Sequence, residues 1–446
     1  MDALNRTGAD IAAYNAGVSE GGGRLLVVSS YKRPCGIAQY VEFLEGPLRA
    51  QTDWNIEIAA LPVTLLRSQS PYARKAASRE IAEIARKAKS ADVVNIQLEP
   101  GLFGLTPMQI WKRLNAIISA SSNVILTYHT VPPMQAERIG LSLDGLANAV
   151  RSWRGNYVFD RLFRKVRQAP RKFHHIVQTT REARNFVLMG IPEETISHMP
   201  LAFLSKDDKD SVDFSADRKA VEKLYELHGK KIIACFGFLS EYKGVEVAIR
   251  AMRLLPEEYH LLVVGGLHPE GLAMRTIRQP YIERLTSEIY PKSYRKYNPG
   301  GAEGPKEERD IYSDPLEKSL LGRVHFCGAL ANEDFNKVMA ACDAVVLPYA
   351  EVGQTSSGPA SLALDLQRPL YCSRTHCFRE LDMYQPGALC FFEIGNHIEL
   401  AEKIAREEAL RKERVQARAA YVQRYNVEAR AALYLEAAFK MKQGLK

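Results

Sequence analysis

The sequence predicts an α/β protein built around two separate parallel sheets. Short runs of β-branched and other apolar residues alternate with longer helical patterns, which is typical of parallel sheets. The alternation occurs twice, and the polar stretch at 205–217 separates the two series. The length of 446 residues and the apolar content of 46% suit two or more globular domains and exclude a disordered or low-complexity chain.

Eleven strands are expected in chain order, each a short apolar run that ends at a turn. The first series comprises 24–30, 56–61, 93–97, 124–128 and 175–179. The second series comprises 231–236, 260–265, 324–327, 344–348, 370–373 and 389–392. Helical patterns, such as the one at 72–88, lie between the strands.

The expected domain organisation follows from these two series. It consists of a polar, Gly-rich flexible tail at 1–23, a first domain at 24–204, a linker at 205–217, a second domain at 218–415 with a long insertion at 268–323, and a C-terminal helix at 416–446 that packs across both domains. No apolar run reaches the roughly 20 residues that a membrane span needs, and the tail lacks the apolar core of a signal peptide. We therefore expect a cytoplasmic protein. A connection as long as the insertion is usually functional or disordered, so its Tyr-rich part is a candidate lid or partner surface.

The seven cysteines are an odd number with no C-x-x-C pair, and most lie in apolar segments. Free thiols are therefore expected in place of disulfides or a zinc site. The net charge is +8, but eight Lys and Arg and only one Asp lie between 151 and 175, so this stretch carries most of the excess.

On a helical wheel, the apolar residues of 151–175 fall on one side and most of its basic residues on the other. Trp153 and Tyr157 lie with the basic residues. This pattern fits either a core-packed helix with a solvated basic face or a helix that lies on an anionic membrane surface. No groove-reading or base-stacking motif accompanies the charge, so nucleic acid is not expected as a partner.

Turns that lead from a parallel strand into a helix expose backbone N–H groups, which attract anions. The first such turn contains Gly36, which either starts a helix or lets a bound group approach the backbone. The second contains His129 at the end of a strand, where its ring could donate to a sugar hydroxyl or a phosphate. The first turn lacks the G-x-G-x-x-G fingerprint, which disfavours a dinucleotide oxidoreductase.

Two further turns lie in the second series. Gly237 and Lys243 belong to FGFLSEYKG, where the lysine would supply a point charge for a phosphate. Ser356, Ser357 and Gly358 precede Pro359, which suits a first helical position. They form either a simple helix cap or a cradle for a diphosphate.

Taken together and in this order, the segments resemble retaining GT-B glycosyltransferases of family 4. The resemblance runs over about 24–406. It rests on SSYKRPCGIAQY, FGFLSEYKGVEVAIRAM, HLLVVGG, VHFCGALANEDFNKVMAACDAVVLPY and SSGPASLALDLQRPLYCS. It implies two Rossmann-like domains that face an interdomain cleft, a nucleotide-sugar held mainly by the second domain, an acceptor held mainly by the first, and neither cofactor nor metal.

The resemblance also implies roles for individual residues. Gly36 would lie beside the phosphates and sugar of the donor, and His129 would contact the donor sugar. Lys243, Ser356 and Ser357, with Gly237 and Gly358 beside them, would stabilise the departing diphosphate. Many members carry two Glu separated by seven residues, where this chain has Gln354 and Leu362. We expect Glu351 or Gln354 to touch the donor.

The function that this resemblance implies is transfer of a hexose from a nucleotide-sugar to a lipid-linked saccharide or polysaccharide acceptor, such as a lipopolysaccharide or exopolysaccharide precursor. GDP-mannose and UDP-glucose are the first candidate donors. The basic stretch 151–175 would then bind the anionic inner face of the cytoplasmic membrane. A nucleotide-sugar epimerase and a catalytically degenerate binding or scaffold protein remain as alternatives, the latter because of Gln354 and Leu362.

Overall fold

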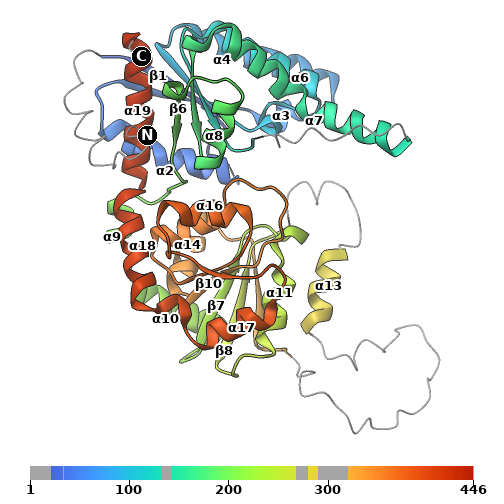
Figure 1. The fold of residues 1–446 in the computed structure, drawn as a ribbon, viewed down its shortest axis with the longest axis vertical. Coiled ribbons are helices and arrows are strands. Elements are labelled where there is room, and N and C mark those ends of the chain that lie inside the picture. Colours follow the sequence, from blue (N-terminus) through green and yellow to red (C-terminus); the bar gives the residue numbers. More distant parts are fainter. Residues whose placement is uncertain (1–21, 34, 132–142, 268–279, 290–319, 445–446) are drawn as a thin grey trace. The chain divides into compact units, whose positions relative to one another are not determined.

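The computed structural model describes residues 22–33, 35–131, 143–267, 280–289 and 320–444, and the side chains of 143–155 are not described (Figure 1). The chain forms two units, each with its own sheet. One unit comprises Met1–Ser205, Gly353–Gly358 and Gln423–Lys446, and the other comprises Lys206–Val352 and Pro359–Val422. The chain therefore returns to the first unit for its last residues.

The sheet of the first unit has six parallel strands in the order β2-β1-β3-β4-β5-β6. These are β1 (Arg24–Ser29), β2 (Asn55–Ala60), β3 (Val93–Leu98), β4 (Val124–Tyr128), β5 (Phe173–Val177) and β6 (Ile196–His198). Its helices are α2 (Gly36–Ala50), α3 (Val63–Leu66), α4 (Pro71–Lys89), α5 (Pro100–Phe103), α6 (Pro107–Ala120), α7 (Leu143–Gln168), α8 (Thr180–Leu188) and α19 (Val427–Gln443). The sequence predicted every strand except β6, which has only three residues.

The sheet of the second unit also has six parallel strands, in the order β12-β11-β10-β7-β8-β9. These are β7 (Lys231–Phe236), β8 (Tyr259–Val264), β9 (Val324–Gly328), β10 (Ala344–Leu347), β11 (Leu370–Ser373) and β12 (Cys390–Phe392). Its helices are α9 (Lys206–Asp210), α10 (Phe214–Tyr225), α11 (Val245–Met252), α13 (Pro280–Ile289), α14 (Asn332–Ala341), α15 (Gly358–Asp365), α16 (His376–Tyr384), α17 (His397–Ala405) and α18 (Lys412–Arg424).

The two strand orders fix where each unit can bind a ligand. In a parallel sheet the strand order reverses beside the first strand, and ligands bind at the carboxyl ends of the strands at that point. The reversal lies between β1 and β3 in the first unit and between β7 and β10 in the second. The order of the second unit is that of a Rossmann sheet, whereas that of the first is flavodoxin-like.

The two faces of the first sheet differ in chemistry. Val94, Ile96 and other apolar side chains of one face pack in a core with α4, α6 and α7. The alternate positions of β3, Asn95 and Gln97, point to the other face, because successive side chains of a strand alternate. Helices α2 and α19 pack against each other and against the strands β1 and β3.

The C-terminal segment differs from the single helix expected over 416–446. Helix α18 ends at Arg424, and α19 begins at Val427. The break occurs because the side chain of Asn426 accepts a hydrogen bond from the backbone N–H of Ala429 (2.8 Å), which makes Asn426 the N-cap of a new helix.

Two other segments also contain more regular structure than expected. The polar linker at 205–217 holds α9 and the first residues of α10, since Asp213 caps α10 through the N–H groups of Ser215 and Ala216. The long insertion contains α13, which packs on α11. Most of the insertion and nearly all of the tail at 1–23 lie outside the described residues.

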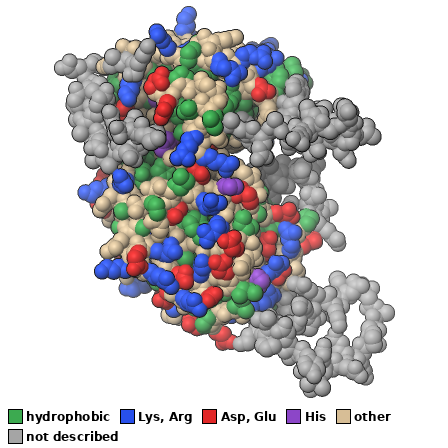
Figure 2. Space-filling model, in the orientation of Figure 1, with side chains coloured by type: hydrophobic (Ala, Val, Ile, Leu, Met, Phe, Trp, Pro, Cys, Tyr) green, Lys and Arg blue, Asp and Glu red, His purple; other side chains and the backbone are tan. Residues whose placement is uncertain are grey.

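All seven cysteines are free thiols, as the sequence predicted. Within the described ranges, no helix is both long enough and apolar enough to cross a bilayer. On the face shown in Figure 2, Lys and Arg side chains are interspersed with Asp and Glu.

Candidate functional site

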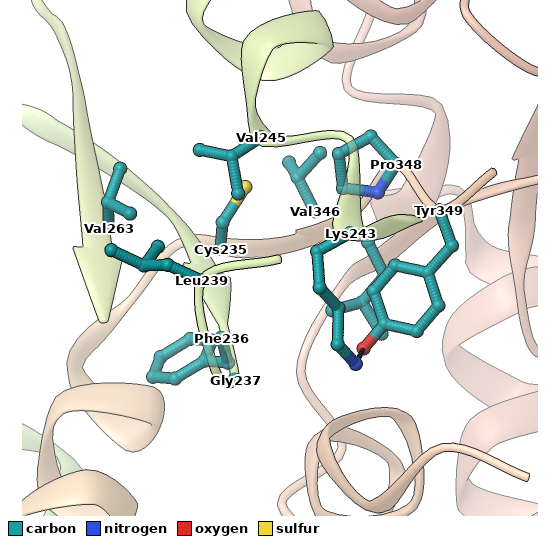
Figure 3. Close-up of a pocket in the computed structure, with 11 residues that line it drawn as sticks. Cys235, Phe236, Gly237, Leu239, Lys243, Val245, Val263, Val346, Pro348 and Tyr349 are labelled. Atoms are coloured by element: carbon teal, nitrogen blue, oxygen red, sulfur yellow. Dashed lines mark hydrogen bonds between the residues drawn. The ribbon is translucent and has the colours of Figure 1, made fainter. Parts of the chain in front are cut away.

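A small pocket opens at the carboxyl ends of β7 and β10, where the strand order of the second sheet reverses (Figure 3). About 230 Å³ of space there, part of it open to solvent, is free of protein atoms. It is lined by Cys235, Phe236, Gly237, Leu239, Lys243, Val245, Val263, Val346, Leu347, Pro348 and Tyr349. Two of the predicted donor-site residues, Gly237 and Lys243, therefore lie in one pocket at the place where this fold class binds ligands.

Lys243 is the charged group of this pocket. Its side chain is only 7% exposed, and its Nζ donates a hydrogen bond to the hydroxyl of Tyr349 (2.6 Å). The same nitrogen lies 3.8 Å from the ring centroid of Tyr349 and 4.9 Å from that of Tyr242. In the part of the chain that the structure describes, no carboxylate pairs with Lys243. Burial lowers the pKa of Lys243 to about 7, because no described carboxylate offsets the cost of burying the charge, and an anion that enters the pocket would favour the charged amine.

The turn around Lys243 depends on two glycines. A Cβ on Gly237 would lie 3.4 Å from Cε and 3.5 Å from Nζ of Lys243, so glycine keeps open the space beside the amine. Gly244 has φ +62°, and a Cβ there would lie 2.0 Å from the carbonyl oxygen of Pro348. The close approach of the two turns after β7 and β10 therefore requires glycine at position 244.

Helix α15 begins at Gly358, directly after the serine pair that the sequence singled out. Ser357 is buried, and Ser356 is partly buried. Pro359 lies in the first turn and approaches the pocket, since its Cγ is 3.7 Å from the position of a Cβ on Gly237. The backbone N–H groups at the start of α15 need partners from outside the helix, which suits an anion.

Glu351 and Gln354 hold different positions. Glu351 is exposed, and its Oε2 accepts a hydrogen bond from the backbone N–H of His376 (2.7 Å) at the start of α16. Gln354 donates through Nε2 to the carbonyl of Ser356. Its Oε1 is buried, and no described residue donates to it. Of these two candidates, Gln354 thus has a polar atom without a partner, whereas Glu351 already serves a helix terminus.

His129 follows β4 in the first unit. Its ring is partly buried, and its Nε2 lies 2.7 Å from Oε1 of Gln97. The rings of His129 and Tyr40 form a T-shaped pair with centroids 5.6 Å apart. Burial, with a smaller contribution from the charge of Arg430, lowers the pKa of His129 to about 3. The ring is therefore neutral at physiological pH.

The segment Gly353–Gly358 also belongs to the first unit. The hydroxyl of Thr355 in this segment donates to the carbonyl of His129 (3.4 Å).

Gly36 is the first residue of α2, as one of the two sequence interpretations holds. Apart from its chain neighbours and the backbone of its own helix, no described residue places an atom within 4 Å of the position of a Cβ on Gly36. The preceding residue, Cys35, makes no side-chain cap, so the N–H groups at the start of this 15-residue helix have no side-chain partner from the cap position. Among the described residues of the turn after β1, open space beside Gly36 thus adjoins a helix start that Cys35 does not cap.

Sequence reasoning missed the partners of these residues. Tyr349 accepts a hydrogen bond from Lys243, and Gln97 bonds the ring of His129. Tyr349 ends one of the stretches that carry the resemblance, but it was given no role there, and Gln97 lies outside those stretches. For Gln97 a signal was present, because VVNIQ places two polar residues in a strand that is otherwise apolar. Among the described side chains, no group of three or more His, Cys, Asp or Glu could hold a metal ion.

Comparison with known proteins gives likenesses in structure alone. No family model matches the sequence, and no curated protein matches it. The structure of Anabaena HepE in complex with UDP is similar, with a TM-score of 0.57 and 16% identity over 93% of this chain and 98% of that one. A glycosyltransferase from Rickettsia africae gives a TM-score of 0.58 and 13% identity, over 94% of this chain and 98% of that one.

A third similar structure is WaaG, a glycosyltransferase involved in lipopolysaccharide biosynthesis, with a TM-score of 0.52 and 14% identity over 92% of this chain and 98% of that one. At such low identity the likeness establishes the fold. Two parallel six-stranded sheets, each with its own helices, make this the GT-B fold that the sequence predicted.

Proposed function

We propose that this chain is a retaining glycosyltransferase that moves a hexose from a nucleoside-diphosphate sugar to a lipid-linked saccharide acceptor. The observation that carries the proposal is the buried amine of Lys243, which lies at the reversal point of the second sheet without a carboxylate partner among the described residues. Departure of a nucleoside diphosphate builds negative charge, and a preorganised cation aimed at that charge lowers the barrier.

Other polar groups support the same assignment. Helix α15 begins at Gly358, directly after Ser356 and Ser357, and the start of a helix attracts phosphate oxygens through its dipole. The unsatisfied Oε1 of Gln354 is a ready acceptor for a sugar hydroxyl. Lys243 and the helix start supply positive charge, so the proposed reaction requires no metal ion. The described residues that line the pocket include no carboxylate that could serve as a nucleophile, which favours attack on the same face of the sugar with assistance from the leaving phosphate.

The donor and the acceptor are the finer parts of the proposal. UDP-glucose is the first donor to test, because the structures of HepE include complexes with UDP and with UDP-glucose, and GDP-mannose is the second.

A lipid-linked acceptor is supported by helix α7. Its apolar residues Val158, Leu162 and Val166 are buried, whereas Arg161, Arg164 and Arg167 are exposed together. Such a face suits the anionic inner surface of the cytoplasmic membrane.

A catalytically degenerate binding protein is the second candidate function. Leu362, which stands where many GT-B enzymes have a glutamate, is buried in α15 and only 3% exposed. A protein of this kind would still bind a nucleoside diphosphate through Lys243, but it would not release one from any nucleotide-sugar. An epimerase would change the nucleotide-sugar without an acceptor.

Thermal unfolding of the full chain with UDP, GDP and their sugar conjugates tests the proposal. A ligand at 100 times its dissociation constant adds about 2.7 kcal/mol to stability, which is readily measured. Lys243→Met should abolish the shift. The matched control is Lys231→Met, since Lys231 also lies over a tyrosine ring, that of Tyr259 at 5.0 Å, but at the other end of β7.

Transfer is then followed by release of the nucleoside diphosphate in the presence of lipid-linked saccharides. Stabilisation by one nucleotide-sugar, its loss in Lys243→Met and acceptor-dependent release would support the proposal. Stabilisation without release for any acceptor would favour the binding protein. No stabilisation by any nucleoside diphosphate would contradict the site itself.

A further inference from the structure

Two buried amides occupy the centre of the first sheet. Asn95 and Gln97 are both fully buried on β3, on the same face of the sheet as Thr127 of the neighbouring strand. Burying an amide costs free energy unless its hydrogen bonds are made, and apolar residues are the usual choice at such positions. These two amides therefore need hydrogen-bond partners at the centre of the sheet.

The amides form a chain of hydrogen bonds whose direction is set by the backbone. Nδ2 of Asn95 donates to the carbonyl oxygen of Ile125 (3.3 Å) and to the hydroxyl of Thr127 (2.9 Å). A carbonyl oxygen only accepts, so Asn95 must present its NH2 group to Ile125 and its Oδ1 to Gln97. Nε2 of Gln97 donates to that oxygen at 2.6 Å. The remaining oxygen of Gln97, Oε1, then faces His129.

This direction determines which ring nitrogen of His129 carries the proton. Oε1 of Gln97 is an acceptor and lies 2.7 Å from Nε2 of His129, so Nε2 must be protonated. In the neutral ring, Nδ1 then has the lone pair. We propose that Asn95 and Gln97 are positioning residues that hold His129 as its Nε2–H tautomer, so that Nδ1 accepts a hydrogen bond from a hydroxyl of the substrate.

Residues of helices α2 and α19 extend this hydrogen-bond network beyond Gln97. The second hydrogen of the Gln97 amide points to the hydroxyl of Tyr434 (3.4 Å), which contacts that of Tyr40 (3.1 Å). Nε of Arg430 donates to the same Tyr40 hydroxyl (2.7 Å), and Arg430 is fully buried. Burial of the His129 ring, with a smaller contribution from this buried cation, lowers the pKa of His129 and keeps the ring neutral.

The inference rests on the proposed function and sharpens it. A neutral His129 whose Nε2–H is already engaged has no N–H left for a phosphate oxygen. Among the described residues Nδ1 has no hydrogen-bond partner. It is therefore an acceptor that suits a sugar hydroxyl, and the sequence expectation that this histidine donates to a sugar hydroxyl or a phosphate does not fit the proposed tautomer.

Nitrogen NMR of the full chain labelled with 15N-histidine tests the inference directly. A fixed tautomer gives His129 one protonated and one unprotonated ring nitrogen, and the signals are assigned by comparison with His129→Gln. We expect Nε2 to be the protonated nitrogen in the unsubstituted protein. Gln97→Met should remove the preference and give averaged signals. Gln178→Met is the matched control, because Gln178 is a buried amide at the end of β5 that donates to Tyr128.

The kinetic prediction is separate from the spectroscopic one. Gln97→Met should lower kcat/KM about tenfold, the equivalent of one hydrogen bond, and Gln178→Met should change it less. If the unsubstituted protein shows His129 protonated at Nδ1, or shows averaged signals for its two ring nitrogens, the inference is overturned. An unchanged tautomer in Gln97→Met would overturn the positioning role. A fixed Nε2–H tautomer in a protein that transfers no sugar would support the chain of hydrogen bonds from Asn95 to His129 and contradict the proposed function.

Discussion

The amine of Lys243 and the hydroxyl of Tyr349 are joined by a hydrogen bond of 2.6 Å, with the amine also held 3.8 Å from the centre of the tyrosine ring. The two residues come from the turns that follow β7 and β10. This contact gives a buried lysine a neutral partner in place of a carboxylate. A neutral partner does not offset the cost of burying a charge, which is why the pKa of Lys243 falls to about 7.

Binding of UDP should therefore take up a proton. The pKa of Lys243 is lowered in the free protein, and a bound diphosphate restores it toward its ordinary value. Below pH 7 the amine is already charged, so affinity is independent of this group. Above pH 7 the amine must first be protonated, so affinity should fall by up to tenfold per pH unit. Calorimetry at pH 8 in two buffers of different ionisation enthalpy measures the uptake, and a value of zero would contradict the prediction.

Glu351→Ala should destabilise the protein by about 1 kcal/mol, because Glu351 accepts from the first N–H of α16 and helix-capping acceptors have this value. Glu351→Gln should keep the stability, since an amide oxygen also accepts. Denaturant unfolding of both variants measures the difference, with Glu402→Ala, which removes an exposed helix ion pair, as the control. Equal stability of the alanine and glutamine variants would show that the cap has no energetic role. A lower transfer rate in Glu351→Gln would then report contact with the donor.

Gly244→Ala should cost about 2 kcal/mol more than Gly229→Ala. Both glycines have a positive φ, +62° and +68°, so both variants carry similar backbone strain. Only at position 244 does the added Cβ meet an atom, the carbonyl oxygen of Pro348, at 2.0 Å, whereas nothing lies within 4 Å at position 229. Urea unfolding compares the two variants. Equal costs would show that the turns after β7 and β10 move apart freely.

Exchange of Arg161, Arg164 and Arg167 for Glu should abolish binding to vesicles that contain anionic lipid. All three are exposed on α7, and each basic residue near such a surface contributes about 1 kcal/mol. The control exchanges Arg74, Lys75 and Arg79, three exposed residues of α4, for Glu and changes the net charge equally. Vesicle flotation measures binding. Equal loss in both variants would indicate a general charge effect in place of a surface on α7.

The sequence predicted the local features of the site and missed those that join distant segments. Strand ends and helix starts depend on neighbouring residues, so Gly237, Lys243 and the start of α15 were found by their turns. Tyr349 is 106 residues from Lys243, and nothing near either residue indicates the contact. The chain of hydrogen bonds that leads to His129 also joins distant segments. Its buried amides were visible within one strand, but their direction depends on the pairing of that strand with the next.

Because α19 belongs to the first unit, the first unit is completed after the second during synthesis. Arg430 contacts Tyr40 across 390 residues, so the polar face of the first sheet lacks its cover until α19 has been made. The second unit has all its residues once position 422 has been translated. The first unit begins synthesis earlier but is completed later, because a long-range contact of this kind must wait for its distant partner. A ribosome that stops between positions 422 and 427 would release a chain with a complete second unit and a first sheet that lacks α19.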